Sequence, residues 1–261
     1  MKIADNPIVD NKVPHLKCTK EDISEIVLLP GDPNRVDFFN EFLEDFKVIS
    51  YNREFKVGKG NYEGVPITIC STGIGGPSTE IAVLELIELG AKVLVRIGGT
   101  GAMKEEIKCG EYILNTAAVR MGGASSFYAM PEYPAVADFD IVHRLKEACK
   151  RMNKISHLGI GASVGSYYRG QGRDIFPDRN DQKSKDLYNE FIRLKVTNIE
   201  MEAETIFTLA SLYGVKAGSI CSTHCNRVTN EWMHDFEPVQ KDMCRIALEA
   251  CKNIYKDINE N

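Results

Sequence analysis

Residues 93–102, with the sequence VLVRIGGTGA, limit most strongly how this chain can fold. The β-branched residues Val93, Val95 and Ile97 are typical of a buried strand, but Arg96 lies among them and three glycines follow within four residues. Glycines let the backbone approach a ligand and adopt positive φ, and a buried charge needs a partner. We therefore expect Arg96 to project into a crevice at the carboxyl end of the strand and bind an anion. The alternative is a structural arginine paired with a carboxylate beside an ordinary glycine turn.

Length, charge and cysteine usage limit the class of protein. The 261 residues contain no linker-like segment, so we expect one α/β domain spanning residues 1–261. A net charge of −5 argues against nucleic acid as a partner, so a bound anion must be held by a local cluster of side chains. Eight scattered cysteines and the lack of a signal-like segment predict a cytoplasmic protein. No run approaches the ~20 apolar residues of a membrane-spanning helix, so no membrane partner is expected.

A second strand-to-helix turn is also suited to an anion. Residues 30–35 follow a predicted strand at residues 26–29. Asp32 can cap the helix that begins there, while Gly31 and Arg35 offer a backbone N–H group and a guanidinium. Because this arginine is the second to follow a strand and a glycine, we expect it to share an anion with the first.

The third such turn is the glycine-rich segment 71–79, between a predicted strand at 65–70 and a helix that reaches Gly90. It lacks the glycine spacing of a dinucleotide site, and the chain has no P-loop lysine motif. The strand–helix–strand order over residues 65–97 predicts a right-handed crossover and a parallel pair of strands. These turns therefore favour a phosphate-sized anion without a bound dinucleotide.

Later segments add groups that suit a nucleoside. Residues 167–173 combine tyrosines, a glutamine and arginines, which give a flat heterocycle a face to stack on and an edge to pair with. A helix predicted from residue 198 to residue 213 begins with three glutamates, one of which we expect to face sugar hydroxyls. The long loop 121–137 is of a length that usually carries function or partner contacts. Cys221 and Cys225 lack zinc-site spacing, so no structural metal is expected.

Together these motifs resemble those of uridine phosphorylases, a family of the nucleoside phosphorylase superfamily. The resemblance extends from about His15 to the C-terminal helix. It implies a single α/β domain with a central mixed β-sheet flanked by helices, and reversible phosphorolysis of uridine to uracil and ribose 1-phosphate by direct phosphate attack at the anomeric carbon. It further implies phosphate as co-substrate, no required cofactor, and a homo-oligomer that is a dimer or a hexamer built from dimers. The motifs that carry it are residues 30–35, 70–78, 96–101, 170–173 and 200–202.

Carried over position by position, the resemblance assigns three groups of ligands. Those for phosphate are Gly31, Arg35, Arg96 and Thr100, with Arg53 supplied by a neighbouring subunit. Those for ribose are Met201 and Glu202, with His15 supplied by the neighbour's N-terminal arm, residues 1–22. Those for the base are Tyr167, Gln171, Arg173 and Gly101. The residues assigned to catalysis are Arg96, Arg173, Gln171 and Arg227, the last on a flap over the base. Positions that bind potassium between subunits in some bacterial relatives are matched by Glu54, Ile74 and Ser78.

Two departures from the family pattern leave alternatives open. Gly99 stands where the family commonly has a threonine whose hydroxyl helps to bind phosphate and ribose, and His224 and Cys225 stand where aliphatic residues usually line the base pocket. One alternative is a related phosphorylase with shifted preference, for deoxyuridine, thymidine or a purine nucleoside; a purine enzyme needs an acid near the base, and Asp235 is the nearest candidate. The other is a catalytically weak nucleoside-binding paralogue, suggested by Gly99.

Overall fold

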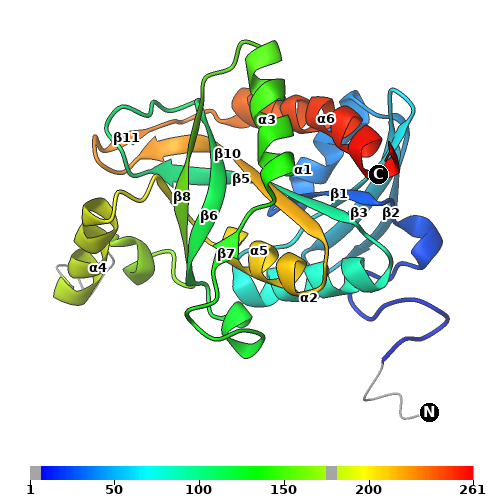
Figure 1. Cartoon of the computed structure of the whole chain (residues 1–261), viewed down its shortest axis with the longest axis horizontal. Coiled ribbons are helices and arrows are strands. Elements are labelled where there is room, and N and C mark those ends of the chain that lie inside the picture. The colour runs from blue at the N-terminus through cyan, green and yellow to red at the C-terminus, as the bar shows by residue number, and fades with distance from the viewer. Residues whose placement is uncertain (1–6, 175–180, 261) are drawn as a thin grey trace.

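In the computed structural model, which describes residues 7–174 and 181–260, eleven strands form one mixed sheet flanked by helices (Figure 1). The expected α/β class is confirmed. The strands are β1 (Ile26–Pro30), β2 (Glu44–Asn52), β3 (Phe55–Tyr62), β4 (Val65–Cys70), β5 (Val93–Ala102), β6 (Tyr112–Met121), β7 (Ala135–Val136), β8 (Ser156–Val164), β9 (Asn198–Glu200), β10 (Lys216–Asn226) and β11 (Glu231–Trp232). The α-helices are α1 (Pro33–Asp37), α2 (Gly76–Glu88), α3 (Phe139–Arg151), α4 (Gln182–Arg193), α5 (Ala203–Leu212) and α6 (Glu237–Glu260). The short 3-10 helices are η1 (Lys20–Asp22), η2 (Phe38–Glu41), η3 (Ala124–Phe127) and η4 (Arg169–Gln171).

Strand β5 lies at the centre of the sheet. It pairs in parallel with β1 on one side and with β10 on the other. Strand β10 also pairs with β6, so β5, β10, β6, β8 and β9 form a closed ring, and β1, β4, β3 and β2 extend from it as an open wing. The crossover strands β4 and β5 are parallel, but β1 lies between them. The carboxyl ends of β1, β4, β5 and β10 therefore meet at one edge of the sheet, where parallel sheets bind ligands.

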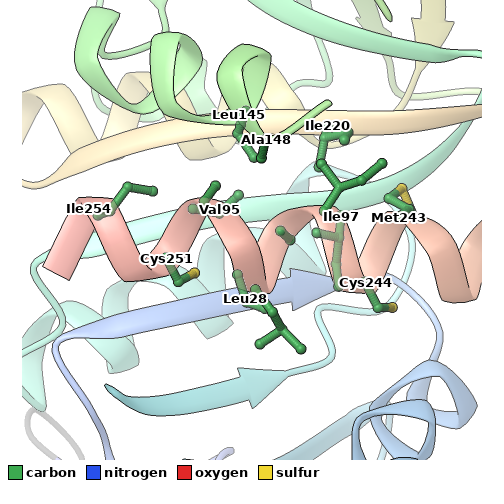
Figure 2. Packing of buried hydrophobic residues seen from close by; sticks show 14 of the residues in the cluster. Leu28, Val95, Ile97, Leu145, Ala148, Ile220, Met243, Cys244, Cys251 and Ile254 are labelled. Carbon is green, nitrogen blue, oxygen red and sulfur yellow. The ribbon is translucent and has the colours of Figure 1, made fainter. Parts of the chain in front are cut away.

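Helices cover the sheet on two sides. Figure 1 shows α3 and α6 on one side and α2 and α5 on the other, and each pair is in contact. Figure 2 shows the core beneath α6, where Met243 and Cys244 approach Ile97 of β5 and Leu28 of β1. Each fully buried aliphatic side chain of this kind contributes roughly 1.5–3 kcal/mol relative to the same side chain exposed. In the described part of the chain, no helix carries an apolar stretch long enough to cross a membrane.

Three predicted elements differ from the structure. The glycines after Ile97 continue β5 instead of forming a turn, and none of them has a positive φ, because they pair with β10. Residues 198–200 form strand β9 and not the start of a helix, because they pair with both β5 and β8. Tertiary pairing therefore overrides a local pattern that favours helix. The sequence also predicts a helix start with Thr19 as N-cap and Asp22 at the third helical position. The structure has only a single 3-10 turn there, in which Thr19 and Asp22 form the cap.

The loop between β6 and α3 is organised by one buried ion pair. Arg120 donates hydrogen bonds to the carbonyl oxygens of Ser125, Ala129 and Tyr133 at 2.8–3.0 Å. Its Nε lies 3.8 Å from Oε2 of Glu204, whose carboxylate is fully buried and accepts hydrogen bonds from the hydroxyls of Ser125 and Thr205. Burial raises the pKa of Glu204, while these hydroxyls and Arg120 oppose the rise. The loop is therefore fixed from inside the fold.

Replacing this arginine should destabilise the protein. We expect Arg120→Ala to lower the free energy of unfolding by about 2–4 kcal/mol, because it removes several buried hydrogen bonds and leaves the Glu204 carboxylate without its cation. Urea denaturation measures the change. Arg193→Ala, at an exposed pair on α4, is the matched control and should leave the midpoint nearly unchanged. Equal effects of the two variants would contradict the assignment.

Candidate active site

A cavity of about 720 Å³ opens where the carboxyl ends of the parallel strands meet. Its wall contains most of the residues expected at the site: Gly31, Arg35, Glu54, Ile74, Ser78, Arg96, Thr100, Gly101, Tyr167, Gln171, Arg173, Met201 and Glu202. The wall does not include His15, Arg53 or Arg227. It also contains groups to which the sequence pointed only weakly or not at all: Glu200, Trp232, Phe236 and Gln240. Segments far apart in the chain thus come together as expected.

Arg35 is held in the cavity wall by the turn after β1. The Asp32 side chain accepts a hydrogen bond from the Asn34 backbone N–H at 2.9 Å, and Pro33 occupies the first helical position, so α1 begins as expected. The Arg35 Nη1 donates to the carbonyl oxygen of Ile97 at 2.9 Å, and its buried Nε has no partner among the described residues. Burial lowers the pKa of Arg35, and the charge of Arg96 adds to this effect. A buried guanidinium with an unused donor is suited to an oxyanion.

Arg96 lies in the same wall, between two carboxylates. Its Nε is 2.8 Å from Oε2 of Glu200 and its Nη2 is 2.6 Å from Oε2 of Glu202. Although burial opposes it, the charges of Glu202 and Glu200 raise the pKa of Arg96. Burial raises the pKa of Glu202, and Arg96 opposes that rise. Both sequence interpretations are thus partly met, because Arg96 faces the cavity and also has carboxylate partners.

Backbone groups fix this buried triad of Arg96, Glu200 and Glu202. Glu200 accepts hydrogen bonds at 2.9 Å from the backbone N–H groups of Glu202 and Ala203, and so caps the start of α5. Glu202 accepts one from the Gly75 N–H at 2.6 Å, at the start of α2. Gly98 is required for the triad, because a Cβ at this position would lie 2.6 Å from Nη2 of Arg96. The three side chains are therefore placed by two helix starts and one strand.

The positions expected to bind potassium lie together at the rim. The Ser78 Oγ is 2.8 Å from Oε1 of Glu54 and 2.6 Å from the carbonyl oxygen of Thr72, and Ile74 is 77% exposed. Gly73, which has φ of 69°, makes room for them, because its Cβ would lie 2.6 Å from the Ser78 Oγ. Carboxylate, hydroxyl and carbonyl oxygens are donors of the type that hard cations prefer. Within the described residues, no cluster of three His, Cys, Asp or Glu side chains is placed to hold a metal.

Another group in the cavity wall suits a flat polar ring. The Arg173 guanidinium lies 4.3 Å from the centre of the Tyr167 ring, and its Nε donates to Oε1 of Gln171 at 3.3 Å. Arg227 lies beside this wall and its side chain packs on Gly101, where a Cβ would meet the Arg227 Cγ at 3.0 Å. The buried Nη1 of Arg227 has no partner in the described chain, and burial followed by the charge of Arg173 lowers its pKa. This group thus has unused hydrogen-bond donors and a ring face.

His15 and Arg53 lie outside this cavity. The Nδ1 of His15 is 2.6 Å from Oε1 of Glu85, whose carboxylate also accepts hydrogen bonds from the backbone N–H groups of His15 and Leu16. Arg53 is exposed in the turn between β2 and β3, with φ of 56°. The side chain of Asn52 donates to the His15 carbonyl oxygen at 2.8 Å, which ties this turn to the arm. Neither predicted ligand therefore lines the chain's own cavity.

The surroundings of the positions that depart from the family pattern are as follows. The Thr100 hydroxyl donates to the carbonyl oxygen of Ile199 at 2.8 Å and accepts from Nδ2 of Asn198 at 2.9 Å, so it is turned toward β9. His224 lines the cavity beside Gly99 without filling it. Asp235 is exposed, accepts a hydrogen bond from the backbone of Glu237, and does not line the cavity.

The sequence of this chain is similar to those of known phosphorylases. A sequence profile described as the Phosphorylase superfamily matches residues 25–258. The chain belongs to this superfamily. It is 42% identical over 238 residues to a uridine phosphorylase of Thermococcus kodakarensis, a match that covers 91% of this chain and 85% of that protein. It is 36% identical over 245 residues to a uridine phosphorylase of Escherichia coli, covering 92% and 97% of the two chains. A guanosine phosphorylase of Halorubrum lacusprofundi is 36% identical over 217 residues, covering 83% and 85%.

Three residues of the cavity wall in this phosphorylase were not predicted from the sequence: Trp232, Phe236 and Gln240. Trp232 belongs to β11, which pairs with the end of β10, and Gln240 lies in the first turns of α6. Phe236 is 36% exposed and stacks on His224. The position of all three depends on how β10 meets α6. The only local signal was the presence of two aromatic residues, Trp232 and Phe236, in a polar segment.

Proposed function

We propose that this protein is a uridine phosphorylase, a pentosyltransferase that converts uridine and phosphate reversibly to uracil and ribose 1-phosphate. The observation that carries the proposal is one cavity whose wall contains both the pair Arg35 and Arg96 and the group Tyr167, Gln171 and Arg173. The uridine phosphorylases among its relatives support the choice of reaction. Phosphate is the co-substrate and no cofactor takes part.

Each of these two groups of wall residues has a distinct role in this reaction. Phosphate, held by Arg35, Arg96 and the Gly31 N–H group, attacks the anomeric carbon as the bond to N1 of uracil breaks. The electron pair of that bond moves onto the base, where Arg173 and Gln171 donate hydrogen bonds that strengthen as negative charge develops. The protein thus aligns two substrates and stabilises charge, and no covalent nucleophile is needed.

The buried triad connects the two substrates. Arg96 forms ion pairs through Nε with Glu200 and through Nη2 with Glu202. Its Nη1 forms no hydrogen bond or ion pair with the described residues and is left for phosphate. Glu202 and Met201 lie beside it and bind the ribose. Because Glu202 accepts from Gly75 through one oxygen, the other is shared between Arg96 and a ribose hydroxyl. Thr100 contributes to the phosphate site as part of the wall, since its hydroxyl is already engaged.

The choice of base is tested directly by comparing nucleosides. Purified protein is assayed for phosphate-dependent base release from uridine, deoxyuridine, thymidine, inosine and guanosine. We expect uridine to give the highest kcat/KM and the purine nucleosides to react much more slowly, because Asp235, the candidate acid for a purine base, lies outside the cavity. Faster release from guanosine would favour the activity named for the Halorubrum relative. Nucleoside binding without turnover would indicate a non-catalytic paralogue.

The arginine proposed to contact the base should matter for catalysis. We expect Arg173→Ala to lower kcat/KM for uridine by roughly ten- to a few-hundred-fold, because a hydrogen bond to a charged group contributes on the order of 1.5–3 kcal/mol. Steady-state kinetics at saturating phosphate measure the loss. Arg193→Ala, at an exposed arginine on α4, is the control. A change below about twofold for Arg173→Ala would be inconsistent with contact to the base, given that hydrogen-bond contribution.

We also propose that residues 1–261 form one domain that assembles into a homo-oligomer, either a dimer or a hexamer built from dimers. In it Arg53 and residues 1–22, of which 1–6 lie outside the described residues, serve the neighbour's site. The exposed Arg53 and the position of His15 outside their own cavity support this arrangement. An intracellular, cytoplasmic location is supported by eight free thiols, seven of them buried.

Mixing two inactive variants tests this sharing. Arg53→Ala lacks the donated arginine and Arg96→Ala lacks the resident one, so each homo-oligomer should be nearly inactive. Dissociating and reassociating the two together should restore activity, because a mixed dimer contains one site with both arginines. Two copies of the same variant, treated in the same way, are the control. Failure to regain activity, with mixed oligomers confirmed by mass spectrometry, would show that Arg53 acts within its own chain or not at all.

The rim oxygens of Glu54 and Ser78, with the backbone at Ile74, are proposed to bind potassium at the contact between subunits. No step of the reaction depends on this ion. Replacing sodium by potassium at constant ionic strength should raise the melting temperature of the unsubstituted protein but not that of Glu54→Gln. An equal response in both proteins would count against a site at this rim.

A further inference from the structure

A β-bulge places His224 over Gly99. Strands β5 and β10 pair in parallel, but the register shifts between Thr223 and Cys225, so His224 is the extra residue of the bulge. Bulges change the direction of a side chain. A Cβ on Gly99 would lie 2.3 Å from Cε1 and 2.6 Å from Nδ1 of the His224 ring. A threonine at position 99 is therefore incompatible with this position of His224, and the two departures from the family pattern are physically one exchange.

Three neighbours fix the ring. It stacks on Phe236 with ring centres 4.5 Å apart and 12° between the planes. Its Nε2 lies 3.0 Å from the Ser222 Oγ and 3.3 Å from the amide Nε2 of Gln240. Because the amide nitrogen donates, the His224 Nε2 accepts, and a neutral imidazole then carries its proton on Nδ1. The orientation of the ring and the position of its proton are thus set by β10, α6 and the segment before α6.

The remaining nitrogen faces the site. Nδ1 forms no hydrogen bond with the described residues, while the ring lines the cavity beside Gly99 and Arg35. Burial, with a smaller effect from the charge of Arg35, lowers the pKa of His224 to about 4, so the ring is neutral at pH 7. A neutral N–H donor close to a buried guanidinium favours an oxyanion, since both groups can donate to it.

We propose that the Nδ1–H of His224 donates a hydrogen bond to an oxygen of the phosphate held by Arg35, in place of the threonine hydroxyl that Gly99 cannot supply. The inference rests on the proposed function, because it concerns the co-substrate of that reaction. Arg35 and Arg96 favour phosphate over a ribose hydroxyl as the acceptor. The exchange of two residues then conserves one donor in the site and shifts it from β5 to β10.

The experiment is a double-mutant cycle read by calorimetric titration with inorganic phosphate alone. His224→Ile removes the donor, Gly99→Thr displaces the ring, and the double variant has the residue types usual in the family. His224→Phe is a matched control that keeps a flat ring on Phe236 without a nitrogen. We expect His224→Ile and His224→Phe each to bind phosphate at least roughly tenfold more weakly than the unsubstituted protein, since the lost hydrogen bond is to a charged group. Gly99→Thr should also bind more weakly, and the double variant should recover to within about threefold of the unsubstituted protein.

Either of two binding results would overturn the inference, and so would one kinetic result. One is phosphate binding in His224→Phe within about twofold of the unsubstituted protein, given the hydrogen-bond contribution above. The other is a double variant whose loss is the product of the two single losses. A rise in the KM for uridine with no change for phosphate would assign Nδ1 to the ribose and also contradict the proposal. Circular dichroism checks that each variant is folded.

The failure of this inference can be told apart from failure of the proposed function. Phosphate binding is measured without nucleoside, so it does not depend on which base the enzyme accepts. If the unsubstituted protein binds phosphate through His224 but releases no uracil from uridine, the proposed function fails and this inference stands. If uridine is cleaved with the same phosphate KM in His224→Phe, the reverse holds.

Discussion

The ion pairs between Arg96 and the carboxylates of Glu200 and Glu202 are the interaction on which the rest of the site depends. All three side chains are nearly inaccessible to water, so each charge needs the others. Removing one partner of a buried ionic group typically costs more than the group contributes in total, because a charge is left uncompensated. The triad also joins β5, β9 and the starts of α2 and α5. One electrostatic unit thus serves both the junction of four elements and the centre of the cavity.

The sequence predicted the parallel part of this fold well. Strands ending in glycine or a capping residue at 30–35 and 71–79 were recognised because local chemistry, such as the Asp32 cap, decides those turns. It predicted strand β9 incorrectly, because three alternating glutamates are typical of a helix start while the pairing of residue 198 with β5 and β8 is set by distant residues. The glycines after Arg96 were expected both to let a ligand approach and to adopt positive φ, and the second of these expectations was wrong. They are needed for the space that a missing Cβ leaves, not for positive φ.

The site, too, was predictable where neighbouring residues decide it and not where distant segments meet. Residues within one motif, such as Gln171 and Arg173, could be grouped from spacing alone, and the structure places both in the cavity wall. Phe236 and Gln240 could not, because their place in the wall depends on how β10 meets α6 and on their contacts with His224, the extra residue of a bulge. The register of a bulge depends on both strands and is not encoded in either segment separately. The departures at positions 99 and 224 were visible in the sequence, but not the contact that makes them a pair.

The carboxylate of Glu85 has a consequence for the proton on the His15 ring. A carboxylate can only accept, and it lies 2.6 Å from Nδ1, so that nitrogen must carry hydrogen. In a neutral ring the lone pair is then on Nε2, which lies at the opposite edge of the imidazole. Any hydroxyl that approaches Nε2 must therefore donate the hydrogen bond. A single glutamate behind the arm thus determines the direction of a hydrogen bond in which it takes no part.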